Sequence, residues 1–275
     1  MTAETKRSLK ERYLDVVENA LIGAFIEDAP MPTEGYKDLV SHVLHQLTGQ
    51  VTEPSPEALG YNPTLRDVGW DWPSKAFTMV GRKRLRNFRD LIERSIADGV
   101  PGDIIETGVW RGGASIMARA VLMAHDISDR KIIVADSFEG LPPPAADQYP
   151  ADYDSKLHEF PELAISLEQV QENFRKFDLL DDQVVFLKGW FRDTMPTVSS
   201  ERFAVLRLDG DMYESTIDPL RHLYDRLSPG GWIIIDDYGF VAACKQAVHD
   251  FLDARRLTPE IHPIDGAGVY FQKPG

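Results

Sequence analysis

Beyond about residue 100, short apolar runs alternate with amphipathic helical segments, and this rhythm constrains the fold more than any other feature of the chain. The runs are rich in β-branched and aliphatic residues, as parallel strands buried on both faces are. Right-handed crossovers between such strands produce a doubly wound α/β sheet of Rossmann-like type. The expected strands are Ile104–Thr107, Lys131–Ala135, Val184–Leu187, Ala204–Leu208 and Trp232–Ile235, and the expected helices are 114–125, 167–177, 215–226 and 242–255.

The two ends of the chain have a different pattern. Residues 260–273 form two short strand-like runs around Asp265-Gly266-Ala267-Gly268, which predicts a terminal hairpin. Apolar residues before residue 100 recur at helical spacing, and residues 50–77 are rich in proline, glycine and aromatic residues, which predicts a long loop packed on the body. The expected N-terminal helices are 9–24, 36–47 and about 80–97.

We therefore divide the chain into an N-terminal helical region, residues 1–100, and an α/β domain, residues 101–275. The formal net charge of −14 argues against nucleic acid or an anionic membrane as a partner, because both bind clustered positive charge. Cys244 is the single cysteine, which excludes an intrachain disulfide. The sequence has neither a signal-peptide pattern nor a long apolar run, so we expect a soluble, cytoplasmic protein.

The first expected strand runs into a glycine-rich turn and a helix start, with the sequence IIETGVWRGGAS over residues 104–115. Gly108 can adopt positive φ, and the following helix N-terminus suits a carboxylate or phosphate. Trp110 interrupts the G-x-G-x-x-G pattern, and this weakens a dinucleotide-binding interpretation. A plain strand–helix turn is the alternative for this motif.

Asp136 ends the second expected strand, where doubly wound folds hold the hydroxyls of a ribose. A residue that only caps the next turn is the alternative. Because Asp136 follows the Gly108 turn by one strand and one helix, we favour ribose binding.

Acidic residues follow the fourth and fifth expected strands, in the sequences LDGDMY, residues 208–213, and IDDYG, residues 235–239. Neighbouring parallel strands would bring Asp209, Asp211, Asp236 and Asp237 together at the carboxyl edge of the sheet. Carboxylates in such proximity need a cation or protons, and oxygen ligands favour Mg²⁺, with Mn²⁺ or Ca²⁺ as alternatives. Acidic turn residues facing water are the simpler interpretation, but two such pairs favour a metal site.

Three further features carry weaker signals. Trp190 and Phe191, after the third strand, could sandwich a flat base or belong to the core. His158, in the proline-rich insertion 141–165, is a candidate catalytic residue, although a loop histidine is usually solvated. The basic run at Lys83, Arg84 and Arg86 is interpreted as a solvated helix face.

Taken together, the motifs resemble the macrocin O-methyltransferase family, the class I S-adenosylmethionine enzymes that methylate sugar hydroxyls of natural products. The resemblance covers nearly the whole chain. The matching segments are YLD (13–15), TMVGRKRL (78–85), ETGVWRGG (106–113), DSFEGLP (136–142), KGWF (188–191), LDGDMYEST (208–216) and IDDY (235–238).

The resemblance implies a methyltransferase sheet with a reversed final strand, an N-terminal helical lid, Mg²⁺ dependence and a homodimer or larger homo-oligomer. It assigns the metal to Asp209, Asp236 and Asp237, and the role of general base to Asp209. The cofactor residues that it implies are Thr78, Met79 and Val80 for the methionine part, Glu106, Gly108 and Ser115 for the amino-acid end and turn, Asp136 for the ribose, and Ser137, Trp190 and Phe191 near the adenine.

The expected acceptor is a small glycosylated molecule such as a macrolide or aminocoumarin antibiotic. A metal-dependent catechol or phenol O-methyltransferase is the main alternative enzyme. A non-catalytic cofactor-binding protein is an alternative from another class, and a nicotinamide dehydrogenase is disfavoured by Trp110 and the acidic cluster.

Overall fold

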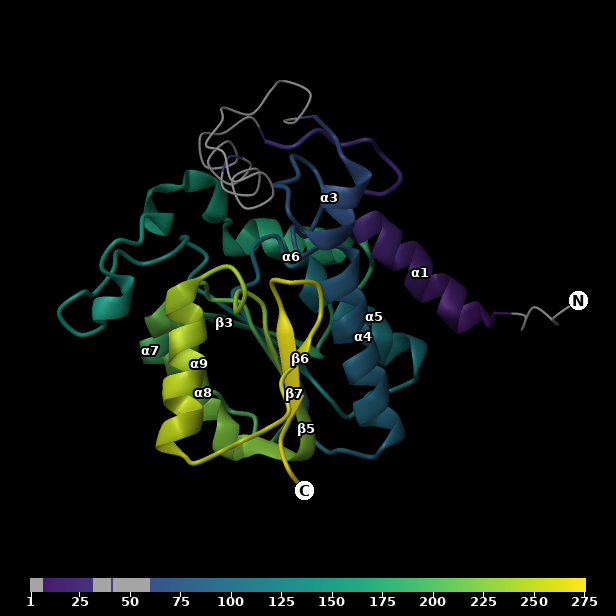
Figure 1. The fold of residues 1–275 in the computed structure, drawn as a ribbon. Coiled ribbons are helices and arrows are strands. Elements are labelled where there is room, and N and C mark those ends of the chain that lie inside the picture. The colour runs from purple at the N-terminus through teal and green to yellow at the C-terminus, as the bar shows by residue number, and fades with distance from the viewer. Residues whose placement is uncertain (1–6, 32–40, 42–59) are drawn as a thin grey trace, which may run out of the picture.

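The computed structural model describes residues 7–31, 41 and 60–275, and its centre is a seven-stranded sheet (Figure 1). The strand order is β3-β2-β1-β4-β5-β7-β6. The strands are β1 (Asp103–Thr107), β2 (Ile132–Asp136), β3 (Val184–Lys188), β4 (Phe203–Leu208), β5 (Leu227–Ile235), β6 (His262–Pro263) and β7 (Val269–Gln272).

The first five strands are parallel, and β7 runs antiparallel to β5. This confirms the doubly wound sheet with a reversed final strand, including the terminal hairpin, in which β6 pairs with β7. The strand order changes direction between β1 and β4, because β2 and β3 follow on one side and β5 on the other. Open α/β sheets bind ligands beyond the carboxyl ends of the strands at such a switch point.

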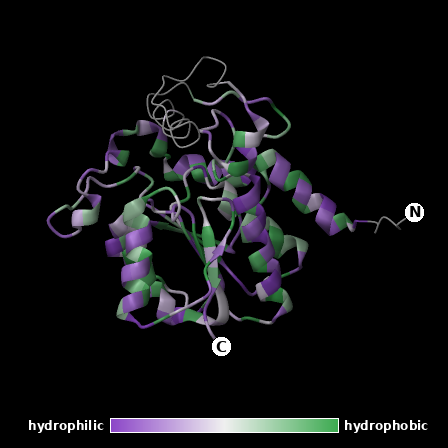
Figure 2. Cartoon of the chain, in the orientation of Figure 1, coloured by the Kyte–Doolittle hydropathy of each residue, from purple (hydrophilic) through white to green (hydrophobic). Residues whose placement is uncertain are grey.

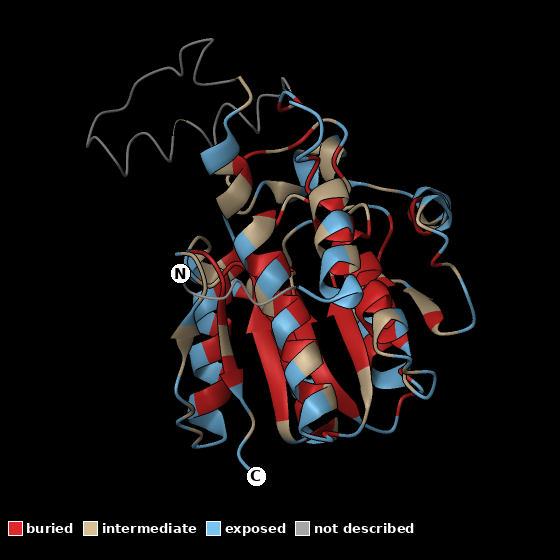
Figure 3. Cartoon of the chain, turned by 90° about the vertical axis from the view of Figure 1, so that its right-hand side faces the viewer, coloured by how far each residue is buried: buried red, intermediate tan, exposed pale blue. Residues whose placement is uncertain are grey.

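Helices cover both faces of the sheet (Figure 1). Ile104 and Ile105 are adjacent on β1 but lie in the two separate cores, because successive strand residues point to opposite faces. Figure 3 shows the strands as a buried layer behind the helices. Helix α4 (Gly81–Ala97) belongs to the N-terminal region, and the helices after it are α5 (Gly113–Ala124), α6 (Leu167–Lys176), α7 (Phe191–Thr194), α8 (Tyr213–Leu223) and α9 (Ala242–Ala254).

The helices differ in how far they are buried. In α5, ten residues from Gly113 to Leu122 are buried, because α1, α4 and β2 all pack against this helix. Helices α4 and α9 carry many hydrophilic residues, shown in Figure 2. Within the described ranges, none of the helices has both the length and the apolar character needed to cross a membrane.

The N-terminal region confirms two expected helices and corrects the expected loop. Helix α1 (Leu9–Leu21) begins at a Ser8 capping box, and α4 matches the helix expected at 80–97. The helix expected at 36–47 and the first part of the 50–77 loop lie outside the described residues. The described part of this expected loop, residues 60–77, contains a helix, α3 (Pro63–Val68). Asn62 caps its N-terminus, and Gly69 ends it.

Aromatic contacts confirm that the 60–77 segment packs on the body. The rings of Trp70 and Phe240 lie 5.2 Å apart, and those of Phe77 and Phe177 lie 5.0 Å apart. The third pair joins Trp72 to Phe160, with ring centroids 5.8 Å apart, and brings this segment against the 141–165 insertion.

The 141–165 insertion is held by side-chain hydrogen bonds near its middle, at Asp152, and near its end, at Glu162. It contains three short 3₁₀ helices: η1 (Pro150–Asp152), η2 (Leu157–Glu159) and η3 (Pro161–Leu163). The Asp152 carboxylate accepts the amides of Tyr213, at 2.7 Å, and Glu214, at 3.0 Å, and so caps the N-terminus of α8. The Trp110 indole donates to the carbonyl of Glu162.

Candidate active site

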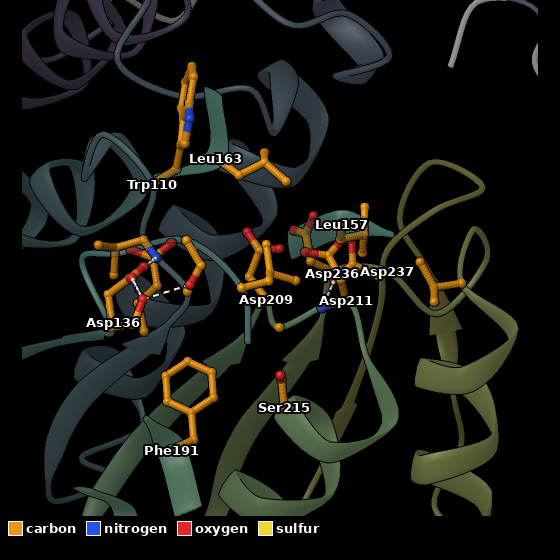
Figure 4. Close-up of a pocket in the computed structure, with 18 of the residues that line it drawn as sticks. Trp110, Asp136, Leu157, Leu163, Phe191, Asp209, Asp211, Ser215, Asp236 and Asp237 are labelled. Atoms are coloured by element: carbon orange, nitrogen blue, oxygen red, sulfur yellow. Dashed lines mark hydrogen bonds between the residues drawn. The ribbon is translucent and has the colours of Figure 1, made fainter. Parts of the chain in front are cut away.

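A cavity of about 420 Å³ lies beyond the carboxyl ends of β1, β4 and β5 (Figure 4). Its lining combines the sheet edge with residues 78–80 before α4, with the 141–165 insertion and with the start of α8. Nearly every motif identified in the sequence therefore contributes residues to the lining of this one cavity.

The Gly108 turn forms the floor between β1 and β4. Gly108 has φ of +81°, and a Cβ atom there would lie 1.7 Å from the Asp209 carbonyl oxygen. Only glycine permits this approach, which brings the ends of β1 and β4 together. The Gly113 amide at the α5 N-terminus donates to the Phe77 carbonyl, so the protein itself uses part of the predicted anion site.

Asp136 lines the cavity at the end of β2, as predicted. One of its carboxylate oxygens accepts the Val109 amide at 2.7 Å, and the other accepts the Phe138 amide at 2.8 Å. Burial nevertheless raises the pKa of Asp136 above its usual value. These bonds fix the carboxylate at the cavity wall, where its remaining lone pairs can accept ligand hydroxyls.

Glu106 is buried on β1 between Ser115 and Arg207. Ser115 donates to Oε2 of Glu106, and Nη1 of Arg207 lies 2.7 Å from Oε1. Burial raises the pKa of Glu106 to about 7, although the nearby Arg207 acts in the opposite direction. Glu106 lines the cavity, whereas Ser115 does not and contacts a lining residue only through its hydrogen bond to Glu106.

Asp209, Asp236 and Asp237 converge at the ends of β4 and β5. Each offers one oxygen, and these atoms lie within 4.8 Å of one another. Burial and the Asp236 carboxylate raise the pKa of Asp209 to about 6, and burial with neighbouring carboxylates also raises the pKa of Asp237. The structure therefore brings together the three residues expected to hold a metal.

Asp211 completes this acidic cluster. It has φ of +60°, and its amide donates to Oδ2 of Asp237 at 3.0 Å. Burial and the Asp209 charge raise the pKa of Asp211 to about 7. The positive φ is an uncommon backbone conformation for an aspartate, and such outliers concentrate at functional sites.

Two buried arginines in the cluster were not predicted. Arg207, on β4, contacts Glu106, Asp209 and Asp236, and its side chain is fully buried. Arg84, on α4, contacts Asp236 and Asp265, and its side chain is 6% exposed. The interpretation of Arg84 as part of a solvated helix face is therefore wrong, because Arg84 points into the molecule while Lys83 and Arg86 are exposed.

The cluster suits a hard divalent cation. Six carboxylates surround two guanidinium groups: those of Glu106, Asp209, Asp211, Asp236, Asp237 and Asp265. Burial is the main cause of the raised pKa values of Glu106 and Asp211, and the neighbouring carboxylates raise them further. All of the potential ligands are oxygens, which Mg²⁺, Mn²⁺ and Ca²⁺ prefer.

The structure places most predicted cofactor residues in the same cavity. Apart from Ser115, the lining includes all of them: Thr78, Met79, Val80, Glu106, Gly108, Asp136, Ser137, Trp190 and Phe191. His158 is exposed on η2 and is not among the lining residues, although its neighbour Leu157 is. The structure does not bring His158 to the acidic cluster.

The side of the cavity formed by the insertion and α8 has an apolar wall and two buried carboxylates. Leu157, Phe160 and Leu163 of the insertion supply the wall. Glu214 and Asp218, each 5% exposed, also line it, and each has a buried oxygen without a hydrogen-bond partner in the described part of the chain. The sequence analysis missed both, although their i, i+4 spacing places them on one helix face.

The sheet with its reversed final strand and the cavity at its switch point define an α/β methyltransferase of Rossmann-like type. The model of the macrocin O-methyltransferase family matches residues 10–273, so the chain belongs to this family. It is an O-methyltransferase, and this finding contradicts the dehydrogenase alternative.

Three curated relatives cover nearly the whole chain. The chain is 48% identical to the 8-demethyl-8-(2,3-dimethoxy-α-L-rhamnosyl)-tetracenomycin-C 4′-O-methyltransferase of Streptomyces olivaceus, over 96% of this chain and 93% of that protein. It is 46% identical to the mycinamicin III 3″-O-methyltransferase of Micromonospora griseorubida, over 96% of each chain. It is 44% identical to the demethyldecarbamoylnovobiocin O-methyltransferase of Streptomyces niveus, over 99% of this chain and 97% of that protein.

A solved structure supports the same fold. The O-methyltransferase NovP superposes with a TM-score of 0.84 at 43% identity, covering 97% of this chain and 100% of that chain. The calicheamicin methyltransferase CalS11, at 18% identity and a TM-score of 0.56, shares the fold.

Proposed function

We propose that the chain transfers a methyl group from S-adenosylmethionine to a sugar hydroxyl of a glycosylated natural product, with Mg²⁺ at the acidic cluster. The observation that carries this proposal is the cavity in which Asp136 and the Asp209–Asp236–Asp237 cluster face the same space. Relatives named as 4′-O- and 3″-O-methyltransferases of a rhamnosyl-tetracenomycin and of mycinamicin III support the substrate class.

The residues at the β1–β2 end would hold the cofactor. Asp136 is fixed by two backbone amides and would accept the ribose hydroxyls. Thr78, Met79 and Val80 would contact the methionine part, and the rings of Trp190 and Phe191 would lie near the adenine. S-adenosylmethionine supplies a sulfonium methyl group that needs alignment and no further chemical activation.

Asp209, Asp236 and Asp237 would hold the metal. Mg²⁺ supplies the positive charge that lowers the pKa of an acceptor hydroxyl, which is otherwise a poor nucleophile at neutral pH. Methylation of a hydroxyl releases one proton, and Asp209 would accept it. Arg207 holds Oδ2 of Asp209 at 2.8 Å and so orients this carboxylate.

The insertion side would receive the acceptor. An apolar aglycone fits the wall formed by Leu157, Phe160 and Leu163, and sugar hydroxyls fit the unpartnered oxygens of Glu214 and Asp218. We also propose that the protein forms a homo-oligomer, because Leu9 and Val16 on α1 are 84% and 57% exposed.

The proposal is tested first by calorimetry with S-adenosylhomocysteine, with and without Mg²⁺, beside a nicotinamide cofactor. We expect only S-adenosylhomocysteine to bind. Methyl transfer is then measured on demethyldecarbamoylnovobiocin, mycinamicin III and a catechol, with Mg²⁺ or with a chelator. Metal-dependent methylation of a glycoside supports the proposal, and methylation of the catechol alone favours the catechol-type alternative. Binding of S-adenosylhomocysteine without methylation of any of the three acceptors contradicts the proposed acceptor class.

A further inference from the structure

Arg84 joins the acidic cluster to two segments outside the parallel sheet. Its Nη1 contacts Oδ2 of Asp236, while its Nε lies 3.0 Å from Oδ2 of Asp265 in the β6–β7 hairpin. Its Nη2 donates to the carbonyl of Gly69, at the end of α3, at 2.9 Å. The planar guanidinium presents its donors in a fixed fork that reaches all three partners, a geometry that the compact ammonium of a lysine does not have.

Both oxygens of Asp236 are engaged by arginines in this structure. Arg84 contacts Oδ2, and Arg207 contacts Oδ1. Asp236 is also one of the three ligands in the proposed metal site, on which this inference rests. A divalent cation that binds Asp236 must therefore approach a carboxylate whose two oxygens already contact buried guanidinium groups, and the repulsion from these groups opposes it.

Of the two arginines, Arg84 is the one whose side chain can move away from Asp236. Arg207 lies on central strand β4 and is held by Glu106 and Asp209 as well as by Asp236. Arg84 enters from α4 and would keep Asp265 and the Gly69 carbonyl as partners after leaving Asp236.

We propose that Arg84 is an internal cation that competes with the divalent metal for Asp236. Arg84 is then a positioning residue, which holds the acidic cluster together when the metal is absent. Metal binding is then linked to the crossing of α3 and α4. The backbones are close at this crossing, since a Cβ atom on Gly69 would lie 2.4 Å from the Val80 carbonyl oxygen.

The test measures Mn²⁺ affinity by electron paramagnetic resonance, with the metal alone as the probe. In Arg84→Met we expect Mn²⁺ to bind about tenfold more tightly than in the unaltered protein, because a competing charge is removed. A loss of structure alone would weaken binding, so the sign of the change separates competition from a general structural role.

Arg86→Met is the matched control, because it removes the same charge from the same helix. Arg86 is half-exposed and pairs with Glu18, which Arg82 also contacts, so Glu18 keeps a partner in this variant. We expect its Mn²⁺ affinity to stay within about twofold of the unaltered protein, because solvent screens a charge at the surface.

Arg84→Gln decides the question if Arg84→Met does not fold, because it also removes the charge but keeps a side-chain amide that can donate to Asp265 or to the Gly69 carbonyl. Tighter Mn²⁺ binding in Arg84→Gln supports the proposal, and equal or weaker binding overturns it. Equal or weaker binding in a folded Arg84→Met, or equal tightening in Arg86→Met, also overturns it. Absence of Mn²⁺ binding in every protein, the unaltered one included, would instead remove the proposed metal site itself.

Discussion

Nη1 of Arg207 lies 2.7 Å from Oε1 of Glu106, and the two residues are direct neighbours in the register of β4 and β1. Both side chains are buried, and Arg207 also contacts Asp209 and Asp236. A buried cation with three carboxylate partners is costly to remove, because the remaining charges lose their compensation. The centre of the sheet therefore depends on an electrostatic network whose carboxylates also line the candidate active site.

The first prediction concerns Arg207→Met. We expect it to lower the free energy of unfolding of the metal-free protein by about 3–5 kcal/mol, because Glu106 is left as an unpaired buried charge. Urea unfolding followed by circular dichroism measures this change. Arg175→Met is the comparison, since Arg175 and its partner Glu172 are both more than half exposed, and its loss should lower the free energy of unfolding by about 1 kcal/mol or less. Equal losses in the two variants would show that the network does not stabilise the fold.

The second prediction is a pH dependence that Glu106 imposes on stability. Burial raises the pKa of Glu106 to about 7 in the folded protein, above the ordinary value near 4.5. Between these values the folded state binds more protons than the unfolded state, so the free energy of unfolding falls as the pH rises. The decline should span about pH 4.5 to 7 in the metal-free protein.

Glu106→Gln should flatten that decline, because glutamine does not titrate. Urea unfolding at a series of pH values from 5 to 8 compares the two proteins. Asp209 and Asp211 have raised pKa values as well, so part of the decline should persist in the variant. Profiles that run parallel throughout would show that Glu106 does not titrate in this range.

The third prediction concerns backbone packing at Gly108. Its φ is +81°, and an added Cβ would lie 1.7 Å from the Asp209 carbonyl oxygen, so Gly108→Ala should destabilise the protein by about 4 kcal/mol or more. Gly99→Ala is the matched control, because its φ is +66° but no atom lies within 4 Å of the added Cβ. Gly99→Ala should lower the free energy of unfolding by only about 1–2 kcal/mol, because an alanine in the left-handed backbone conformation is the only unfavourable change. Thermal unfolding that shifted equally in both variants would contradict the close strand approach.

Much of the fold follows from local pattern, whereas the charge compensation within the site does not. The parallel strands and the terminal hairpin were predictable because apolar runs and turn residues act within a few positions, whereas the reversed direction of the final strand was implied only by the family resemblance. The convergence of Asp209 with Asp236 was predictable because parallel strands end at one edge. Arg84 was not predictable, because its burial depends on Asp236 and Asp265, which lie far from it in the sequence.

Helix α3 was missed for a related reason. Proline and glycine were interpreted as loop residues, but Pro63 occupies the first turn of the helix, where its missing amide costs nothing. Gly69 ends the helix in the left-handed conformation that a helix terminus favours. The same residue types therefore delimit a short helix rather than exclude one.

The fourth prediction addresses cofactor binding at Asp136. Asp136→Asn should weaken S-adenosylhomocysteine binding by about 10-fold or more, since an amide cannot accept two ribose hydroxyls as a carboxylate does. Calorimetry measures the affinity. Asp129→Asn, at an exposed site, removes the same charge and should have little effect. A similar loss in both variants would attribute the effect to net charge and would contradict a direct contact at Asp136.

The fifth prediction separates chemistry from cofactor binding at Asp209. Asp209→Asn should abolish turnover while retaining much of the affinity for S-adenosylhomocysteine, because it removes a proposed metal ligand and proton acceptor. Single-turnover methyl transfer and calorimetry measure the two properties on the same preparation. Asp211→Asn is the comparison, because Asp211 lines the same cavity with a pKa raised by burial to about 7 but lies outside the metal triad. Turnover lost in Asp211→Asn but kept in Asp209→Asn would move the role of proton acceptor to Asp211, and equal loss of turnover and cofactor affinity in Asp209→Asn would contradict its proposed role.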